Sequence, residues 1–539
     1  MSSTILSYPI SCEGGLDETS THRELQQKPG WASQLLNFEP SMDGGYRRVN
    51  GYTKLGIAGK TPDLTESQIL GTKIHNEGFV ICKGRHIYFT YDADEWVQLN
   101  KLNAKDKPAT KTEMDAKAVW NRDIFTGFYQ FEKFSQGTKE ILIAVSENNN
   151  PAYLTIEGTQ MDNTTFTFKE ITLSQGSLKG ADQLVKYKDQ LVISGMDTAP
   201  TEIYYSDILK TDNFEGANAG SIGFNDEVMG LKMFRDILYV FCRNSIHKVV
   251  GLETGSPQRV PVTSQLGCVA GNSIQEVSGD LVFLGPDGLR TLSATERISD
   301  INLSTMSHRI QGRLRRAIQN IDKYDVQTTV IRNKSQYRLF FKPSTAGVSR
   351  APIAFIMFMG LDTEGNVRPE FSELAGFDIA NIDSGYVGVT ETIISGDTKG
   401  NIYYHDRGFD FDGQDMNFIY HTPFFDLGDI TIRKSIHKIM TKILPEGVVD
   451  FNMTLVYDDE TNNNYNPPAY PMDSTSAPAR YGTGKYGSGT YGTSKFLALE
   501  TLTEGSGKVV SIRIFPSGTR CDSFSIHGYD LLFLPAGKL

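Results

Sequence analysis

The sequence predicts an all-β chain: a β-propeller of six to eight blades with an inserted helix, followed by a C-terminal β-sandwich-like domain. The first observation is a repeated pattern of a short apolar run, a turn with Gly, Asp or Asn, and a second apolar run. The second is the interval between these runs, roughly 45–60 residues, which is typical of propeller blades. The third is composition, because 51 glycines and 11% aromatic residues favour short strands and tight turns.

Seven segments carry this repeated pattern. A single sheet of this kind cannot bury both of its faces, and radial stacking of several sheets solves the problem. A large β-sandwich, or two unrelated β domains, is the alternative. The segments are 78–99, 139–158, 184–207, 228–251, 274–293, 328–344 and 390–406.

Changes in composition divide the chain. We expect an N-terminal arm and docking segment over 1–50, the propeller over 51–415 and the C-terminal β domain over 416–539. Residues 461–495 form a long Pro-, Gly- and Ser-rich stretch that no ordinary loop in a compact domain requires. Its regular tyrosines favour an extended arm lying on a neighbour over a disordered loop. They are Tyr481, Tyr486 and Tyr491.

One helix is predicted within the propeller region, around residues 305–323. Apolar residues fall at intervals that place them on one helical face, and arginines occupy the other face. The apolar face holds Ile310, Leu314, Ile318 and Ile321, and the arginines are Arg309, Arg313, Arg315 and Arg316. The basic face is either simply solvated or a contact surface for DNA or a neighbouring subunit.

The net charge of −11 argues against general nucleic-acid binding, because phosphate neutralisation requires a basic surface. An acidic surface can still line a path along which DNA slides without adhering. The five cysteines are widely spaced and form no CxxC, so neither a zinc site nor a disulfide framework is predicted. The first residues lack the pattern of a signal peptide, and no apolar run is long enough to insert into a membrane. We therefore expect synthesis in a cytoplasm.

Motifs for chemistry are weak. P-loop, HExxH and GxSxG motifs are missing, and two GxGxxG matches at 482–487 and 487–492 are by-products of the Tyr-Gly repeat. The cluster Asp410, Asp412 and Asp415 lacks the twelfth-position glutamate of an EF-hand loop, where His421 stands instead. We therefore expect no catalytic residue, no metal site and no cofactor, and the protein is predicted not to be an enzyme.

The stretch NFEPSMDGGYRRVNGY, residues 37–52, resembles a phosphate loop at first sight. A phosphate loop needs a strand before it and a helix after it, and here a polar, turn-rich segment follows. Gly44 and Gly45 instead indicate a turn with positive φ, and Arg47 and Arg48 begin a short strand. The two arginines are expected to hold the N-terminal arm in place, within or between subunits.

The order of motifs resembles tail nozzle or tail hub proteins of short-tailed bacteriophages, the relatives of tail tubular protein B and of packaged-DNA stabilisation proteins. The N-terminal match reads GG-L, then a Pro, then N-F-x-P and GG-x-R-R-x-x-G-Y. Weaker likenesses cover 285–304, 422–439 and the closing strand, whereas the Tyr-Gly arm departs from relatives that carry tryptophans there. The matching positions are Gly14, Gly15, Leu16, Pro29, Asn37, Pro40, Gly44, Gly45, Arg47, Arg48, Gly51 and Tyr52, and Tyr46 within the same stretch is a further candidate for assembly or docking.

The resemblance implies a virion structural protein that repeats around a six-fold axis. Such a homohexameric ring would extend the channel below a tail adaptor protein, retain packaged DNA, dock tail fibres and open at the host cell surface. Its place would be the virion tail. Two alternatives stay open: a receptor-binding or fibre-docking tail propeller, and a propeller glycan hydrolase.

Overall fold

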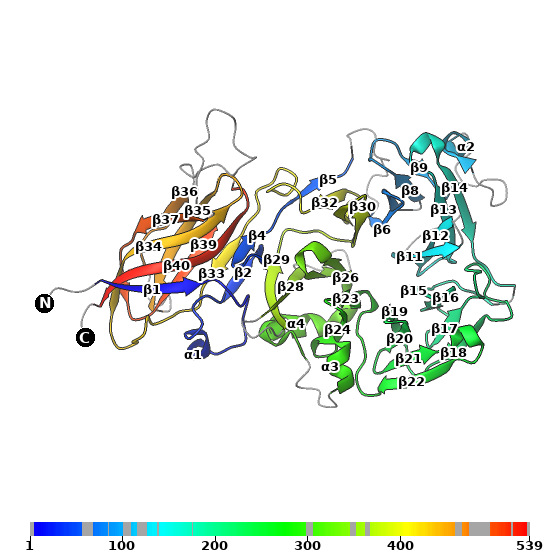
Figure 1. Cartoon of the computed structure of the whole chain (residues 1–539), viewed down its shortest axis with the longest axis horizontal. Helices are drawn as coiled ribbons and strands as arrows, with labels where there is room; N and C mark the ends of the chain where they lie inside the picture. Colours follow the sequence, from blue (N-terminus) through cyan, green and yellow to red (C-terminus); the bar gives the residue numbers. More distant parts are fainter. Residues whose placement is uncertain are drawn as a thin grey trace.

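The computed structural model has two lobes, a ring of small β-sheets and a β-sandwich from which both ends of the chain emerge (Figure 1). The structure describes residues 5–56, 68–84, 86–100, 109–115, 127–136, 139–174, 176–297, 305–344, 352–361, 367–458, 466–473, 496–518 and 521–535.

The first four sheets of the ring follow one another along the chain, and neighbouring strands in each are antiparallel. The first is β6 (Ile69–His75), β7 (Gly78–Lys83), β8 (His86–Thr90) and β9 (Val97–Gln98). The second is β10 (Ala109–Thr110), β11 (Tyr129–Gln136), β12 (Lys139–Ser146), β13 (Ala152–Glu157) and β14 (Thr165–Glu170). The third is β15 (Gln183–Tyr187), β16 (Gln190–Ser194), β17 (Glu202–Tyr205) and β18 (Gly220–Gly223). The fourth is β19 (Val228–Phe234), β20 (Ile237–Cys242), β21 (Ile246–Val250) and β22 (Gln258–Thr263).

Three further sheets complete the ring. One is β23 (Gln275–Val277), β24 (Asp280–Gly285) and β25 (Gly288–Thr291), followed by α3 (Leu292–Arg297). The next is β26 (Tyr324–Ile331), β27 (Gln336–Pro343), β28 (Ile353–Leu361) and β29 (Val367–Leu374), which belong to a larger sheet. The last is β30 (Asn381–Val387), β31 (Thr390–Gly396), β32 (Ile402–His405) and β5 (Tyr52–Lys54).

These sheets confirm the predicted β-propeller. The inner strands of the sheets are β6, β11, β15, β19, β23, β26 and β30, and β30 of the last sheet packs against β6 of the first, which closes the ring. Each of the seven repeated segments of the sequence lies in a different sheet. Buried apolar clusters fill the spaces between neighbouring sheets, as radial stacking requires.

The last sheet of the ring joins two distant parts of the chain. Its outer strand β5 comes from the N-terminal region, whereas β30, β31 and β32 come from the end of the propeller. Tyr52 pairs with His405 and Lys54 with Tyr403. The start and the end of the propeller sequence are therefore hydrogen-bonded within one sheet.

The sandwich is built from both ends of the chain. One sheet contains β3 (Phe38–Pro40), β4 (Tyr46–Arg48), β40 (Phe524–Pro535), β34 (Lys434–Pro445) and β37 (Leu497–Leu502), with β1 (Leu6–Ser11) on β40 and β38 (Ser506–Gly507) on β34. The facing strands are β2 (Gln34–Leu36), β33 (Ile419–His421), β39 (Val510–Pro516), β35 (Asp450–Tyr457) and β36 (Tyr470–Asp473). The segment expected to be an arm, residues 1–50, thus contributes β1–β4 to this sandwich rather than standing apart from it.

One sheet runs through both lobes. Nine strands follow in the order β26-β27-β28-β29-β2-β33-β39-β35-β36, so the propeller sheet continues into the sandwich. The link is β2, which pairs with β29 in parallel through Leu36 and Glu373 and with β33 in antiparallel. Because the two lobes share a hydrogen-bonded sheet, they cannot rotate freely against each other.

Short helices lie at the edges of the sheets. They are α1 (His22–Leu25), α2 (Lys111–Asp115) and α4 (Gln311–Ile318), and α4 continues a single turn over His308–Ile310. Ile310, Leu314 and Ile318 are buried, as the predicted apolar face requires, and Ile321 packs partly buried beside them. In the part of the chain that the structure describes, no helix has the length and apolar character needed to cross a bilayer.

Candidate functional site

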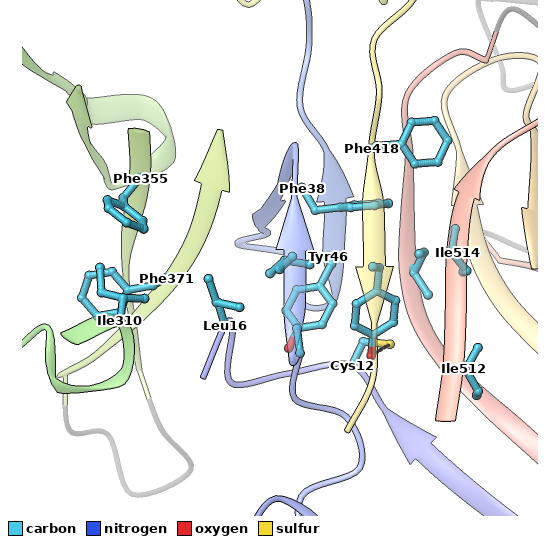
Figure 2. Packing of buried hydrophobic residues seen from close by; sticks show 14 of the residues in the cluster. Cys12, Leu16, Phe38, Tyr46, Ile310, Phe355, Phe371, Phe418, Ile512 and Ile514 are labelled. Carbon is cyan, nitrogen blue, oxygen red and sulfur yellow. Dashed lines mark hydrogen bonds between the residues drawn. The ribbon is translucent and has the colours of Figure 1, made fainter. Parts of the chain in front are cut away.

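The sequence positions that carry the resemblance gather where the propeller meets the sandwich. A single buried cluster extends from the propeller, through the N-terminal segment, into the sandwich. Figure 2 shows Leu16 facing Phe371 and Ile310 on the propeller side, with Tyr46 and Phe418 on the sandwich side. The two lobes therefore share one hydrophobic core.

Gly14, Gly15 and Leu16 attach the chain to strand β29. The amide of Leu16 donates to the carbonyl of Phe371 at 2.7 Å, and the amide of Gly14 donates to Glu370 at 3.2 Å. Gly15 has φ +73°, and a Cβ there would lie 2.8 Å from the backbone of Phe371. Only glycine fits such a close approach, which explains the paired glycines.

Trp31 lies beneath this attachment and is 5% exposed. The guanidinium groups of Arg309 and Arg368 lie 4.2 Å and 4.6 Å from its ring centre, and the Lys28 ammonium lies 4.2 Å away. Arg309 also donates to the carbonyl of Gly14 at 3.2 Å. Burial lowers the pKa of Arg309, and the neighbouring Arg368 acts in the same direction. Cation–π contacts of this kind favour the charged form without an acidic partner.

Gly44 and Gly45 form the turn between β3 and β4, with φ of +85° and +77°. A Cβ on Gly45 would collide with the carbonyl of Ile526 on β40, whereas a Cβ on Gly44 would meet open space. Tyr46 follows and is fully buried. Its hydroxyl donates to the Gly30 carbonyl at 3.0 Å and accepts the Gly15 amide at 3.0 Å. Burial raises the pKa of Tyr46 well above its usual range, so the phenol stays protonated.

Arg47 and Arg48 lie on β4 and point to different partners. Arg47 binds Glu446 through two 2.7 Å contacts and Glu39 at 3.0 Å. Arg48 is 2% exposed and donates to the carbonyls of Cys521 and Phe409, both at 2.9 Å. Both arginines therefore hold segments of the same chain together.

Gly51 and Tyr52 mark the passage from the sandwich to the propeller. The short strand predicted to begin at Arg47 and Arg48 does not continue to Tyr52. The two arginines lie on β4 of the sandwich, whereas Tyr52 begins β5 of the propeller. A Cβ on Gly51 would collide with the Asp410 carbonyl. The Tyr52 ring stacks on Phe411, with ring centres 4.7 Å apart.

A buried ionic network, which the sequence did not predict, lies at the same junction. Glu39 on β3 and Arg338 on β27 are each 2% exposed and lie 3.3 Å apart. Arg338 also binds Asp406 at 3.1 Å, and Lys334 binds Glu39 at 2.9 Å and Asp406 at 3.0 Å. With Arg47, three cations thus surround two carboxylates. Burial raises the pKa of both carboxyl groups, but the surrounding cations outweigh it and lower both pKa values overall.

Acidification is expected to destabilise the junction through Glu39 and Asp406. Both pKa values are lower in the folded than in the unfolded chain, where they lie near ~4. The network's contribution is therefore complete above about pH 5 and is lost as the pH falls below the unfolded values. The measurement is the free energy of unfolding between about pH 7 and pH 3. The Asp406→Asn variant should show a shallower loss over this range than the wild type, and equal slopes would contradict the assignment.

The four arginines near α4 have different surroundings. Arg309 belongs to the Trp31 stack, and Arg313 forms ion pairs with Glu18 and Glu373, which attaches α4 to the N-terminal segment and β29. Arg316 donates to the carbonyl of Gly312 at 3.0 Å within the helix. Arg315 and Arg316 have exposed side chains. The predicted basic face is therefore divided into two partly buried arginines with structural contacts and two exposed ones.

The tyrosines of the predicted arm, Tyr481, Tyr486 and Tyr491, lie outside the described residues.

The centre of the propeller encloses a second candidate site, a channel-like cavity of about 790 Å³. The inner strands of the propeller sheets line this cavity, and its lining includes the polar residues Gln130, Gln275 and Thr329. Charged groups gather near the two ends of these strands. Asp182, Glu227 and Asp325 lie near the starts of inner strands, and Glu147 follows the end of β12, which pairs with the start of β11. Lys73, Glu132, Lys186, Lys232 and Arg332 lie near or beyond the middles of the inner strands.

The acidic end of this cavity is short of compensating charge. Burial raises the pKa of Asp182 to about 7, and the negative charge of Glu147 contributes in the same direction. One carboxyl oxygen of Asp182 is buried without a hydrogen-bond partner among the described residues. Arg243 compensates Glu227 at 2.7 Å.

Comparison with known proteins leaves the family open. No protein-family model matches the chain, and a search of curated proteins gives no match. Among solved structures, Hsv2 of Kluyveromyces lactis is similar at 10% sequence identity with a TM-score of 0.29. That match covers 57% of this chain and 98% of Hsv2.

Proposed function

We propose that this chain is a virion structural protein, a tail nozzle or hub subunit of a short-tailed bacteriophage. In this role it forms the distal DNA channel of the tail, retains packaged DNA and gates its ejection. Its partners are further copies of itself in a ring, a tail adaptor protein, tail fibres, the packaged DNA and the host cell surface.

One observation carries the proposal. The N-terminal residues that resemble the nozzle proteins lie at the junction of the two lobes, where Gly14 and Leu16 attach to β29 and Arg48 binds the carbonyls of Cys521 and Phe409. The nine-stranded sheet passes through the same junction. A subunit that withstands the pressure of packaged DNA needs lobes that keep a fixed orientation, and this junction meets that need.

Charge also supports the proposal. With a net charge of −11, a ring of such subunits would present a mostly acidic surface along which DNA can slide. Arg315 and Arg316 are the accessible arginines of the predicted basic face and remain our candidates for a local DNA or subunit contact.

The oligomeric state tests this function. We expect purified protein to form rings, with six copies as the predicted number, in native mass spectrometry and negative-stain electron microscopy. Antibody labelling should place the protein at the distal end of the tail. A chain that stays monomeric at all concentrations, with no label on the tail, would contradict the proposal.

A tail propeller that binds receptors or docks fibres would be labelled on the tail without forming a ring. A glycan hydrolase is the alternative from another class, and one observation favours it. Asp182 has a pKa raised to about 7 and lies in the electrostatic field of Glu147, as in an acid–base pair. Polysaccharide turnover that Asp182→Asn abolishes would establish the hydrolase instead.

A further inference from the structure

The cavity at the centre of the propeller has a cationic level that its own acidic residues do not neutralise. Lys73, Lys186 and Lys232 line it from three different sheets, on β6, β15 and β19. Glu132 on β11 lies in the electrostatic field of all three, which places them around a common space.

Two of these lysines have no ionic partner. Lys73 binds Asp383 at 2.9 Å, so its charge is compensated. Lys186 lies over the Phe134 ring at 5.0 Å, and neither Lys186 nor Lys232 has a hydrogen bond or an ion pair within the described ranges. Among the residues that line the cavity, Glu132 is the acidic group beside Lys186 and Lys232, whereas Glu276, which acts on Lys232, lies outside the lining; at this level the lining itself therefore carries more positive than negative charge.

Burial disfavours the charged forms of Lys232 and Glu132, although both side chains line the cavity. Burial lowers the pKa of Lys232, and the nearby charge of Glu132 raises it by a smaller amount. Burial likewise raises the pKa of Glu132, although four lysines act against it. Charged groups in such surroundings bind a counterion more strongly than they would in open solvent.

We propose that the central cavity binds a small phosphate-class oxyanion between Lys186 and Lys232, with Lys73 at its side. The cavity volume of about 790 Å³ exceeds what inorganic phosphate or pyrophosphate needs. The acidic side chains at the far end of the cavity repel an anion, so the ligand is confined to the lysine level. This inference is independent of the proposed role in a phage tail.

Isothermal titration calorimetry of the full chain at constant ionic strength tests the site, with inorganic phosphate and pyrophosphate as probes. We expect binding with a Kd below about 1 mM. Lys186→Gln and Lys232→Gln should each weaken it about tenfold, because each removes a charge-assisted hydrogen bond. Glu132→Gln should tighten binding several-fold, because it removes the nearby negative charge.

Lys188→Gln is the matched control. Lys188 lies two residues beyond Lys186 on the same hairpin, but it forms an ion pair with Glu253 outside the cavity. This variant should bind as the wild type does. The lysine variants are expected to fold, because each replaces a charge that has no ion pair among the described residues with a neutral side chain of similar length, and circular dichroism verifies this.

Two results would overturn the proposal. One is the absence of phosphate or pyrophosphate binding up to about 10 mM. The other is binding whose affinity is the same in the wild type and in the Lys186→Gln, Lys232→Gln and Glu132→Gln variants. A single-stranded oligonucleotide with a terminal phosphate is the comparison ligand. If it binds and the small phosphates do not, the site recognises a nucleic-acid end and the assignment to a free oxyanion is wrong.

Discussion

Replacing Arg338 with alanine is expected to lower the free energy of unfolding by about 3–5 kcal/mol. Arg338 is 2% exposed and contacts Glu39, which is equally buried, and Asp406, which is 14% exposed. Its removal leaves these carboxylates with only Lys334 and Arg47 as cationic partners, and an undercompensated buried charge is costly. Chemical denaturation, monitored by tryptophan fluorescence and circular dichroism, measures the change.

The matched control for Arg338 is Arg243→Ala. Arg243 forms a shorter ion pair with Glu227, at 2.7 Å, but both side chains are about half exposed. Its loss should cost less than about 1 kcal/mol because water screens the pair. The double variant Glu39→Gln/Arg338→Ala should cost less than the sum of the two single changes. Equal costs for Arg338→Ala and Arg243→Ala would refute the structural role of the network.

The second large effect is expected at the turn between β3 and β4. Gly45→Ala should destabilise the chain by about 2 kcal/mol more than Gly44→Ala, although both glycines have positive φ. Gly44→Ala introduces only the conformational cost of positive φ, about 1–2 kcal/mol. Gly45→Ala adds a collision with the Ile526 carbonyl on β40, which cannot move without disturbing the sandwich sheet.

The comparison of Gly44 and Gly45 uses thermal and urea denaturation of both variants under identical conditions. Because the two substitutions share the residue type, the turn and the sign of φ, their difference isolates the steric contribution. Similar stabilities of the two variants would mean that β40 tolerates the extra methyl group, and the close approach of the turn would then have no energetic importance.

The sequence predicted the parts of this fold that depend on local patterns. Each repeated apolar segment lies in its own propeller sheet, because period-two alternation and turn residues act over a few neighbouring positions. The buried face of α4 was predicted for the same reason, since Ile310, Leu314 and Ile318 follow helical spacing. The turn at Gly44 and Gly45 was also predicted, because both have the positive φ that glycine permits.

The sequence did not predict what depends on distant pairing. β5 has three residues and no distinctive pattern, and its partner β32 lies some 350 positions away, at Tyr52 and His405. The network of Glu39, Arg338 and Asp406 was missed because nothing local shows that these charged residues are buried together. The cavity lysines were missed for a similar reason, since each comes from a different sheet and alone looks like a solvated surface residue.

The pairing of β1 and β4 with β40 determines when the sandwich can fold during translation. Residues 6–48 leave the ribosome well before the strand that they pair with, residues 524–535. The early strands must therefore stay without their partner while the whole propeller is translated, and they are open to aggregation during that time. The same pairing makes the sandwich depend on late translation, because a chain terminated before residue 524 lacks β40 and cannot form the sandwich. Only chains translated through β40 can complete the sandwich.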